Sequence, residues 1–227
     1  ENAKEAVYEE KKLEEMEVVF LMDRFGYAKT IDAATYERNQ EAADAESRYV
    51  IRCKNTGRIC LFTNTGQLHT VKVLDLPFGK FRDKGIPIDN VSNYSSDKES
   101  ILCVASQTQL NLYRLVFVTK QAMMKVVDGG EFDVSKRLVA ATKLNDGDEL
   151  LHVSILKEQR NIVLQSEEGF FLRFPMDEIP EKKKGAIGVR GMKLSANDAL
   201  EAVYYTQNAI ETSIKYKNKN LVLNSLK

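Results

Sequence analysis

Short apolar runs interrupted by turns recur along this chain. The first covers residues 18–22, is broken by a turn at Gly26, and continues in residues 27–30. An apolar run, a glycine-containing turn and a second strand-like run are typical of a β-hairpin. The pattern therefore predicts an antiparallel hairpin near the start of the chain.

The hairpin pattern recurs three more times. Counting the first, the turn positions are Gly26, Gly66, Ala122 and Gly169, at spacings of 40, 56 and 47 residues. A period of about 40–50 residues with several strands per unit is typical of a propeller-type array. In such an array each small sheet completes its core against its neighbours. A β-sandwich with coincidentally similar hairpins is the alternative fold.

A second landmark repeats in step with the hairpins. Residues 139–148 resemble residues 189–198 at an offset of 50, and residues 85–88 look like a shorter third copy. Four hairpins and a final strand-like run at residues 220–224 predict five blades, or six if an irregular blade lies between His69 and Leu115. The last run is expected to close the last blade.

The N-terminal stretch differs from the rest. Residues 1–16 combine helix formers and charges with few apolar positions, so we expect a short helical lead-in or linker there and one β domain over residues 17–227. Its acidic character does not fit a secretory signal or a transit peptide.

Composition narrows the class of protein. The 227 residues are 43% hydrophobic and 29% charged, which fits a soluble globular protein, and no apolar run reaches the ~18 residues that span a bilayer. Three cysteines without a CxxC motif, and two histidines far apart in sequence, argue against a zinc site or a disulfide framework. We therefore expect reduced thiols in a cytoplasmic protein.

The net charge of zero hides a gradient. Residues 1–46 carry 6 basic and 13 acidic side chains, and the remaining residues carry 27 basic and 20 acidic ones. A basic body behind an acidic start is compatible with an anionic partner.

No catalytic motif is present. The sequence lacks GxSxG, P-loop and HExxH patterns. His152 lies in an apolar run and is expected to be a strand residue. Asp146 and Asp148 flank a glycine, and turn formation explains them better than acid catalysis or a calcium loop does. We therefore predict no catalytic and no metal-binding residues.

The repeats resemble the C-terminal domain of the A subunit of bacterial type IIA topoisomerases, namely DNA gyrase and topoisomerase IV. Residues 115–125, 143–150 and 173–180, the last followed by 188–194, carry the resemblance. It implies an all-β fold, a β-pinwheel of about five to six four-stranded blades that exchange strands with their neighbours.

The resemblance also implies a function. This domain of the family is non-catalytic and bends or wraps double-stranded DNA beside a cleavage core whose tyrosine lies in an upstream domain. ATP and Mg²⁺ would serve the complete enzyme. The fragment itself would bind no cofactor. The expected partners are DNA, the B subunit, and the rest of the A subunit, in the bacterial cytoplasm at the nucleoid, with no membrane and a monomeric isolated domain. A propeller-type protein-interaction scaffold is the first alternative, and a β-propeller hydrolase the second.

One departure from the family stands out. Gyrases of this family carry a box of the type Q-[RK]-R-G-G-[RK]-G on the first blade, whereas residues 39–44 here read Asn-Gln-Glu-Ala-Ala-Asp. This stretch is acidic and helix-prone. The resemblance is therefore closer to topoisomerase IV, or to a gyrase-like protein without strong wrapping.

Wrapped DNA needs cations along a curved outer face, which repeats can supply at regular intervals. Lys29, His69 and Lys125 each follow their turn by three residues, and Arg173 follows its turn by four. Gly185, Gly188 and Gly191 are expected to let backbone amides approach phosphate. The predicted phosphate-contacting set is Lys29, Arg38, Lys80, Arg82, Lys84, Lys125, Lys136, Arg137, Arg173, Lys182, Lys183, Lys184, Arg190 and Lys193.

Overall fold

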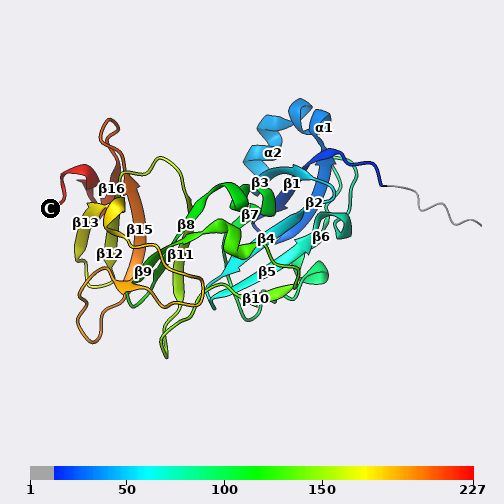
Figure 1. The fold of residues 1–227 in the computed structure, drawn as a ribbon. Helices are drawn as coiled ribbons and strands as arrows, with labels where there is room; N and C mark the ends of the chain where they lie inside the picture. The colour runs from blue at the N-terminus through cyan, green and yellow to red at the C-terminus, as the bar shows by residue number, and fades with distance from the viewer. Residues whose placement is uncertain (1–12) are drawn as a thin grey trace, which may run out of the picture.

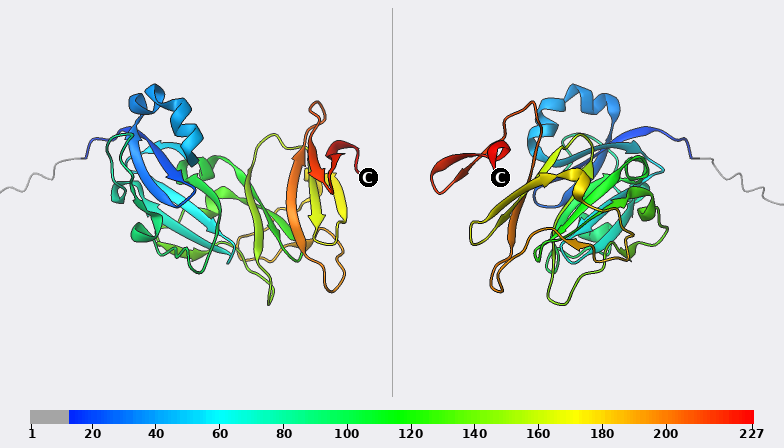
Figure 2. Two further views of the ribbon diagram at one scale, coloured as in Figure 1. Left: turned by 180° about the vertical axis from the view of Figure 1, so that it is seen from behind. Right: turned by 60° about the vertical axis from the view of Figure 1, so that its left-hand side comes forward.

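The computed structural model describes residues 13–227 as a row of small antiparallel sheets (Figure 1). The expected lead-in helix falls largely outside the described residues, and residues 13–16 form neither helix nor strand. The first and last sheets lie at opposite ends of the molecule (Figure 2).

Each of the first four sheets is built on one of the predicted hairpins. A third strand follows in sequence and pairs with the first strand of each hairpin. The hairpins are β1 (Glu17–Asp23) with β2 (Tyr27–Asp32), β4 (Arg58–Thr63) with β5 (Gln67–Lys72), β8 (Arg114–Thr119) with β9 (Met123–Asp128), and β12 (Asn161–Ser166) with β13 (Phe171–Pro175). The third strands are β3 (Ser47–Lys54), β7 (Ile101–Ser106), β11 (Leu150–Leu156) and β15 (Leu200–Thr206).

All four predicted turn positions are confirmed. Gly26, Gly66 and Gly169 have φ values of 86°, 79° and 91°, and Ala122 has a φ of 65°. Glycine adopts this left-handed conformation without a steric penalty, whereas Ala122 adopts it with a fully buried methyl group. The turn at the third hairpin therefore combines backbone strain with packing in the core.

The fourth strand of each complete sheet comes from the following unit. β6 (Ile86–Pro87) pairs with β2, β10 (Leu138–Ala140) with β5, and β14 (Val189–Arg190) with β9. The residue that follows each of these strands donates its N–H to the carbonyl of the turn residue at 2.8 Å, as in Ile88 to Gly26 and Gly191 to Ala122. The second repeated landmark of the sequence, at residues 85–88, 139–148 and 189–198, thus overlaps these exchanged strands.

The last two units are smaller than the four-stranded blades expected. The sheet order β13–β12–β15 has three strands, and β16 (Ser213–Tyr216) with β17 (Lys219–Val222) forms a separate hairpin. β17 pairs with β16 only, so the expectation that residues 220–224 close the last blade is wrong. The stretch between His69 and Leu115 holds no extra blade, because its strands join neighbouring sheets.

The cores lie between successive sheets because alternate residues of a strand face opposite sides. In β4, Leu61 packs toward the first hairpin and Phe62 toward the third. In β8, Phe117 joins Phe62 in an edge-to-face contact at 5.9 Å, while Val116 and Val118 pack toward the fourth hairpin. Both faces of the middle sheets are buried, which explains their continuous apolar runs.

Short helices cover sheet surfaces that no neighbouring sheet buries. α1 (Ala33–Arg38) and α2 (Gln40–Glu46) pack Tyr36 and Ala43 against Val19, Leu21 and Ile31 on the free face of the first sheet. The remaining helix is α3 (Gln107–Leu112), and single 3-10 turns are η1 (Val73–Asp75), η2 (Ile88–Val91), η3 (Gly129–Phe132), η4 (Met176–Glu178) and η5 (Leu223–Ser225).

Cys53, Cys60 and Cys103 are free thiols, and burial raises the pKa of Cys60 to about 12. Within residues 13–227 no helix is long and apolar enough to cross a membrane. The same residues contain no group of three or more His, Cys, Asp or Glu side chains arranged to hold a metal ion.

Candidate nucleic-acid interface

Three equivalent segments run along one edge of the molecule. Each begins after the second strand of a hairpin and ends with the strand exchanged to the preceding sheet. We call residues 73–87, 129–140 and 176–190 the first, second and third outer connections. Because β6, β10 and β14 each pair with the outer strand of their sheet, the topology places all three connections at the same edge.

The outer connections share a charge pattern. Each starts with carboxylates near its 3-10 turn and continues with cations toward the exchanged strand, although Asp83 stands between two cations of the first connection. The carboxylates that open them are Asp75, then Glu131 and Asp133, then Asp177, Glu178 and Glu181. The cations are Lys80, Arg82 and Lys84, then Lys136 and Arg137, then Lys182, Lys183, Lys184 and Arg190.

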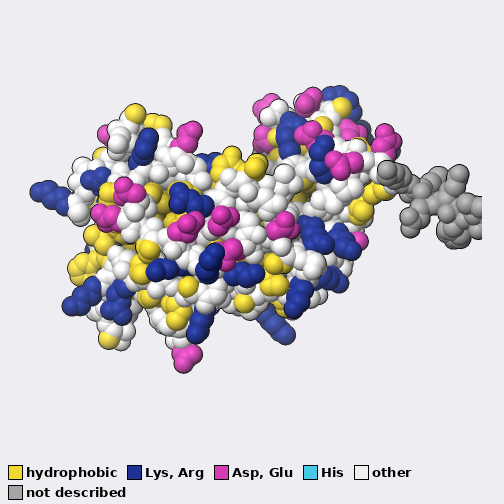
Figure 3. All heavy atoms as spheres, in the orientation of Figure 1, with side chains coloured by type: hydrophobic (Ala, Val, Ile, Leu, Met, Phe, Trp, Pro, Cys, Tyr) yellow, Lys and Arg dark blue, Asp and Glu magenta, His cyan; other side chains and the backbone are white. Residues whose placement is uncertain are grey.

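Most of these cations are exposed. All of them except the half-buried Lys184 are open to solvent, and Figure 3 shows Lys and Arg gathered along the lower face where Figure 1 places β6, β5, β10 and β9. Lys84 lies 4.4 Å from the ring centroid of Tyr27, and Arg137 donates to the carbonyl of Val91 at 3.1 Å. The sequence thus located a repeated row of surface cations.

Lys125 is not part of that surface. It is 1% exposed, and its Nζ donates to the carbonyls of Lys183, Lys184 and Ala186 at 3.1, 3.0 and 2.6 Å. Burial lowers its pKa to about 8, and the Glu131 carboxylate opposes that shift. The prediction that Lys125 contacts phosphate is therefore wrong, because its ammonium group is enclosed by the chain's own carbonyls.

Three further predicted cations are half-buried and engaged. Lys29 Nζ donates to the carbonyls of Phe81 and Asp83, and burial lowers its pKa. Lys184 Nζ donates to the carbonyl of Glu131 at 3.1 Å, and Arg173 Nε donates to the carbonyl of Leu226 at 2.8 Å. These groups hold the fold, so they are poorer candidates for phosphate contact than the exposed cations.

His69 shares the register position of Lys29 and Lys125 but has a different partner. It is 1% exposed, and its Nε2 lies 2.9 Å from Glu99 Oε2. Thr63 and Thr65 also donate to Glu99, each at 2.7 Å. The equivalence of the three positions is confirmed by the registers Leu21↔Lys29, Leu61↔His69 and Phe117↔Lys125.

Besides Lys29, Lys125 and Arg173, two more predicted residues lie outside the outer connections. Arg38 is exposed on α1, and Lys193 is exposed in the link from β14 to β15. The sequence reasoning missed Lys143, which is exposed in the equivalent link after β10. The offset of 50 residues already matched Lys143 to Lys193 and was sufficient to find it.

The glycines in the third connection and directly after it differ in role. A Cβ at Gly188, where φ is 105°, would collide with the Met124 carbonyl oxygen, and one at Gly191 would collide with Met124 Sδ. Both glycines therefore serve the pairing with β9, contrary to the phosphate approach expected of them. Only Gly185 has open space around it.

The stretch that corresponds to the family's basic box forms α2. Glu41 and Asp44 are exposed there, and Asp44 accepts a 2.6 Å hydrogen bond from the Tyr36 hydroxyl. Figure 3 shows acidic side chains gathered over α1 and α2. The first blade is therefore capped by a helix that is acidic where cations were expected.

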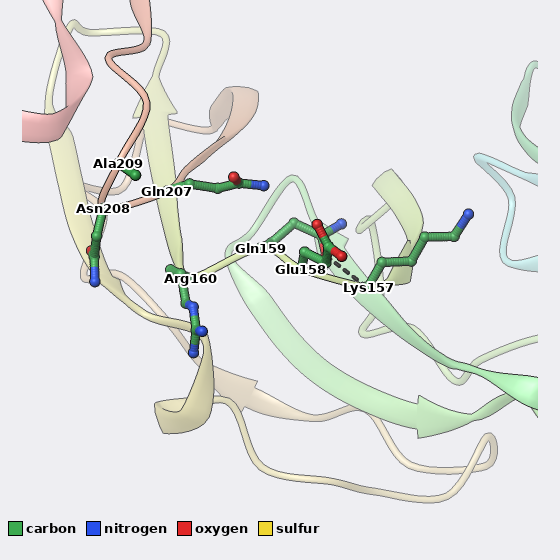
Figure 4. Close-up of a pocket in the computed structure, with 7 residues that line it drawn as sticks. All are labelled: Lys157, Glu158, Gln159, Arg160, Gln207, Asn208 and Ala209. Atoms are coloured by element: carbon green, nitrogen blue, oxygen red, sulfur yellow. Dashed lines mark hydrogen bonds between the residues drawn. The ribbon is translucent and has the colours of Figure 1, made fainter.

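Two further polar features lie outside the outer connections. Asp148 Oδ1 accepts from the N–H groups of Gln121 and Glu149, so it caps a turn, as the sequence predicted. The open hollow in Figure 4 is lined by loop residues 157–160 and 207–209, where Lys157 and Arg160 point away from one another. This arrangement does not converge on a point, as a catalytic group set must.

Comparison with known proteins matches the repeats directly. The family described as the DNA gyrase C-terminal domain, beta-propeller, matches residues 113–157 and 160–207, which are the units β8–β11 and β12–β15. The third and fourth blades are therefore similar to the DNA gyrase C-terminal domain. The recognition made from the repeats is thereby confirmed.

Similar proteins agree with this family. The DNA gyrase A subunit of Lawsonia intracellularis is 28% identical over 209 residues, which are 86% of this chain and 25% of that protein. The chain thus spans about a quarter of the length of that relative.

Two solved structures show the same fold. The C-terminal domain of DNA topoisomerase IV has a TM-score of 0.78 at 20% identity, covering 89% of this chain and 64% of that one. The E. coli ParC C-terminal domain has a TM-score of 0.73 at 13% identity, covering 92% and 86%. The predicted fold class, an all-β pinwheel, is confirmed.

Proposed function

We propose that this chain is the DNA-binding and DNA-bending domain of a type IIA topoisomerase A subunit. It binds phosphates of double-stranded DNA through the exposed cations of the three outer connections. The observation that supports this proposal best is their placement, because strand exchange sets equivalent basic segments at one edge of successive blades. DNA that follows this edge meets a new group of cations at each blade.

The contacts are to the backbone of DNA. Lys and Arg side chains on loops neutralise phosphates irrespective of sequence, whereas base readout needs a helix or ribbon inserted in a groove. The described helices have 6 or 7 residues, and α2 is acidic. Binding is therefore expected to depend on salt and on DNA shape rather than on base sequence.

The rest of the reaction belongs to other parts of the complete enzyme. DNA cleavage, ATP, Mg²⁺ and the B subunit lie outside this non-catalytic domain, which holds a DNA segment beside the cleavage core in the bacterial cytoplasm. The isolated domain works as a monomer.

The test is fluorescence anisotropy with labelled duplexes of two unrelated sequences. We expect equal affinities for both, and if about five phosphates are neutralised, log K should fall with log salt at a slope of about −4 to −5. A slope near zero, or no binding at low salt, contradicts the proposal and favours the protein-interaction scaffold.

A further inference from the structure

Lys29 and Lys125 occupy equivalent places and contact equivalent partners. Each stands opposite a residue of the first hairpin strand, in the registers Leu21↔Lys29 and Phe117↔Lys125. Each reaches an outer connection that comes from the next unit. Lys29 Nζ donates to carbonyls of the first connection, and Lys125 Nζ donates to carbonyls of the third.

The backbone around these lysines repeats as well. Thr30 N–H donates to the carbonyl of Pro77 at 2.9 Å, and Val126 N–H donates to that of Pro180 at 3.0 Å. The connections therefore approach the hairpins in the same way at both blades. In each case the lysine stands one residue before the strand residue that donates this backbone hydrogen bond.

The contact at Lys125 requires a charge. Removing an ammonium group from water is unfavourable unless hydrogen bonds replace the lost hydration. The three carbonyl oxygens supply those bonds, and charge-assisted hydrogen bonds are stronger than neutral ones. A neutral apolar side chain at this position would leave the carbonyls without their donor.

Turning carbonyls inward changes the surface of the connection. Carbonyl oxygens carry partial negative charge, which would oppose a phosphate if they faced outward. Those of Lys183 and Lys184 point toward the buried Nζ, while the side chains of Lys182 and Lys183 are exposed. Glu131 adds a second tie through the N–H of Lys184 at 3.1 Å.

We propose that Lys125 and Lys29 are positioning residues for DNA binding, which fold the third and first outer connections so that their cations face the DNA. This inference rests on the proposed function. Neither lysine touches DNA itself, and each acts through the exposed cations of the connection that it holds.

The second connection offers an internal comparison. His69 takes the lysine position there and binds Glu99 instead. Thr70 holds the connection, since its Oγ1 donates to the carbonyl of Lys136 at 2.8 Å and its N–H to that of Arg137 at 2.9 Å. Loss of Lys125 should therefore leave the cations of the second connection in place.

The test is a double-mutant cycle on duplex binding with the whole chain. The variants are Lys125→Met, the pair Lys182→Ala and Lys183→Ala, and all three together. If Lys125 acts through the third connection, Lys125→Met weakens binding about three- to tenfold in the parent and less than about twofold when Lys182 and Lys183 are already absent. A direct phosphate contact predicts equal losses in both backgrounds and overturns the inference.

A second readout needs no DNA. Trypsin cleaves after Lys182, Lys183 and Lys184 once this segment leaves its contacts. Lys125→Met should speed that cleavage at least about fivefold, whereas Lys120→Met should not. Lys120 is the matched control, because it lies on the same hairpin and pairs with Glu149 at 2.7 Å. Unchanged cleavage in Lys125→Met contradicts the inference.

The first blade provides the same cycle if Lys125→Met fails to fold. Lys29→Met is combined there with Lys80→Ala and Arg82→Ala, and additive losses again count against the inference. If the parent chain does not bind duplex at all, the proposed function fails. If the parent binds and the losses are additive, only the positioning role fails.

Discussion

His152 is a half-buried base held neutral by its surroundings. Its Nε2 lies 2.7 Å from the Tyr205 hydroxyl, which also lies 2.7 Å from Ser154 Oγ. Burial lowers the pKa of His152 to about 4, from an ordinary value of 6.5. The residue bridges the third strands β11 and β15, so its protonation bears on the contact between the third and fourth blades.

We predict a loss of stability in acid that depends on His152. Between pH 6.5 and 4 the unfolded chain binds a proton that the folded chain excludes, so the free energy of unfolding falls as the pH falls. A shift of this size corresponds to roughly 3 kcal/mol at the acid end. Urea unfolding of the parent and of His152→Gln at pH 7 and pH 4 measures it. The variant should lose less stability on acidification, and parallel losses would contradict the assignment.

For individual residues, the sequence predicted the position in the strand register better than the burial and the contacts of the side chain. The spacing from the turns placed Lys29, His69 and Lys125 in one register, which the strand pairing confirms. It did not reveal that Lys125 is enclosed, because the carbonyls around it belong to Lys183, Lys184 and Ala186, which lie 58 to 61 positions further along the chain. A local period carries no information about such a distant partner.

The exchanged strands are the elements that join the blades. They are only two or three residues long, and each pairs with a sheet other than the one its neighbours in sequence build. The repeat offset of 50 residues located two of them, but only the family resemblance indicated exchange. Pairing partners of such short strands do not follow from apolar patterning, since they have too few positions to show a period.

At Gly188, an added side chain should disturb the pairing of the exchanged strand β14 with β9. With φ at 105° and the Met124 carbonyl in the way, Gly188→Ala should lower the free energy of unfolding by about 2–3 kcal/mol. It should also weaken duplex binding, because β14 carries Arg190. Gly185→Ala is the control, since its Cβ meets nothing within 4 Å. Chemical denaturation of both variants checks this, and equal stabilities would show that β14 tolerates displacement.

The charge arrangement belongs to the whole molecule. Zero net charge is reached by combining an acidic segment, residues 1–46, with a basic remainder whose cations recur on three outer connections. Sequence predicted the gradient and most of these cations because they are local features. It did not predict the carboxylate-to-cation order within each connection, which acquires meaning only once the connections lie at one edge.

We predict that the three connections contribute separately to duplex binding. The pairs Lys80→Ala with Arg82→Ala, Lys136→Ala with Arg137→Ala, and Lys182→Ala with Lys183→Ala each remove two charges. Each pair should reduce the salt slope by about 1.8, and the losses in log K should add. Lys215→Ala with Lys219→Ala on the exposed β16–β17 hairpin is the control for charge alone. If one pair removes all binding, DNA does not follow the edge.

The acidic helix α2 sets the limit on how far DNA follows that edge. Strong bending of a duplex costs on the order of several kcal/mol, which phosphate contacts must offset. The three outer connections supply those contacts, but α2 presents Glu41 and Glu46 at the first blade, beside the stretch that corresponds to the family's basic box. Carboxylates there repel phosphate, so the wrap should end at the first outer connection and should not extend over α2.

We therefore predict that the chain bends DNA without wrapping it fully. When a nicked plasmid is ligated with the chain bound, the change in linking number should stay well below about one per bound chain. The double variant Glu41→Lys and Glu46→Lys should enlarge that change, while Asp44 is kept because it binds Tyr36. Glu41→Gln with Glu46→Gln should give an intermediate change, which separates charge repulsion from helix shape. A large shift in the parent chain would mean that the connections alone close the wrap and that α2 does not limit it.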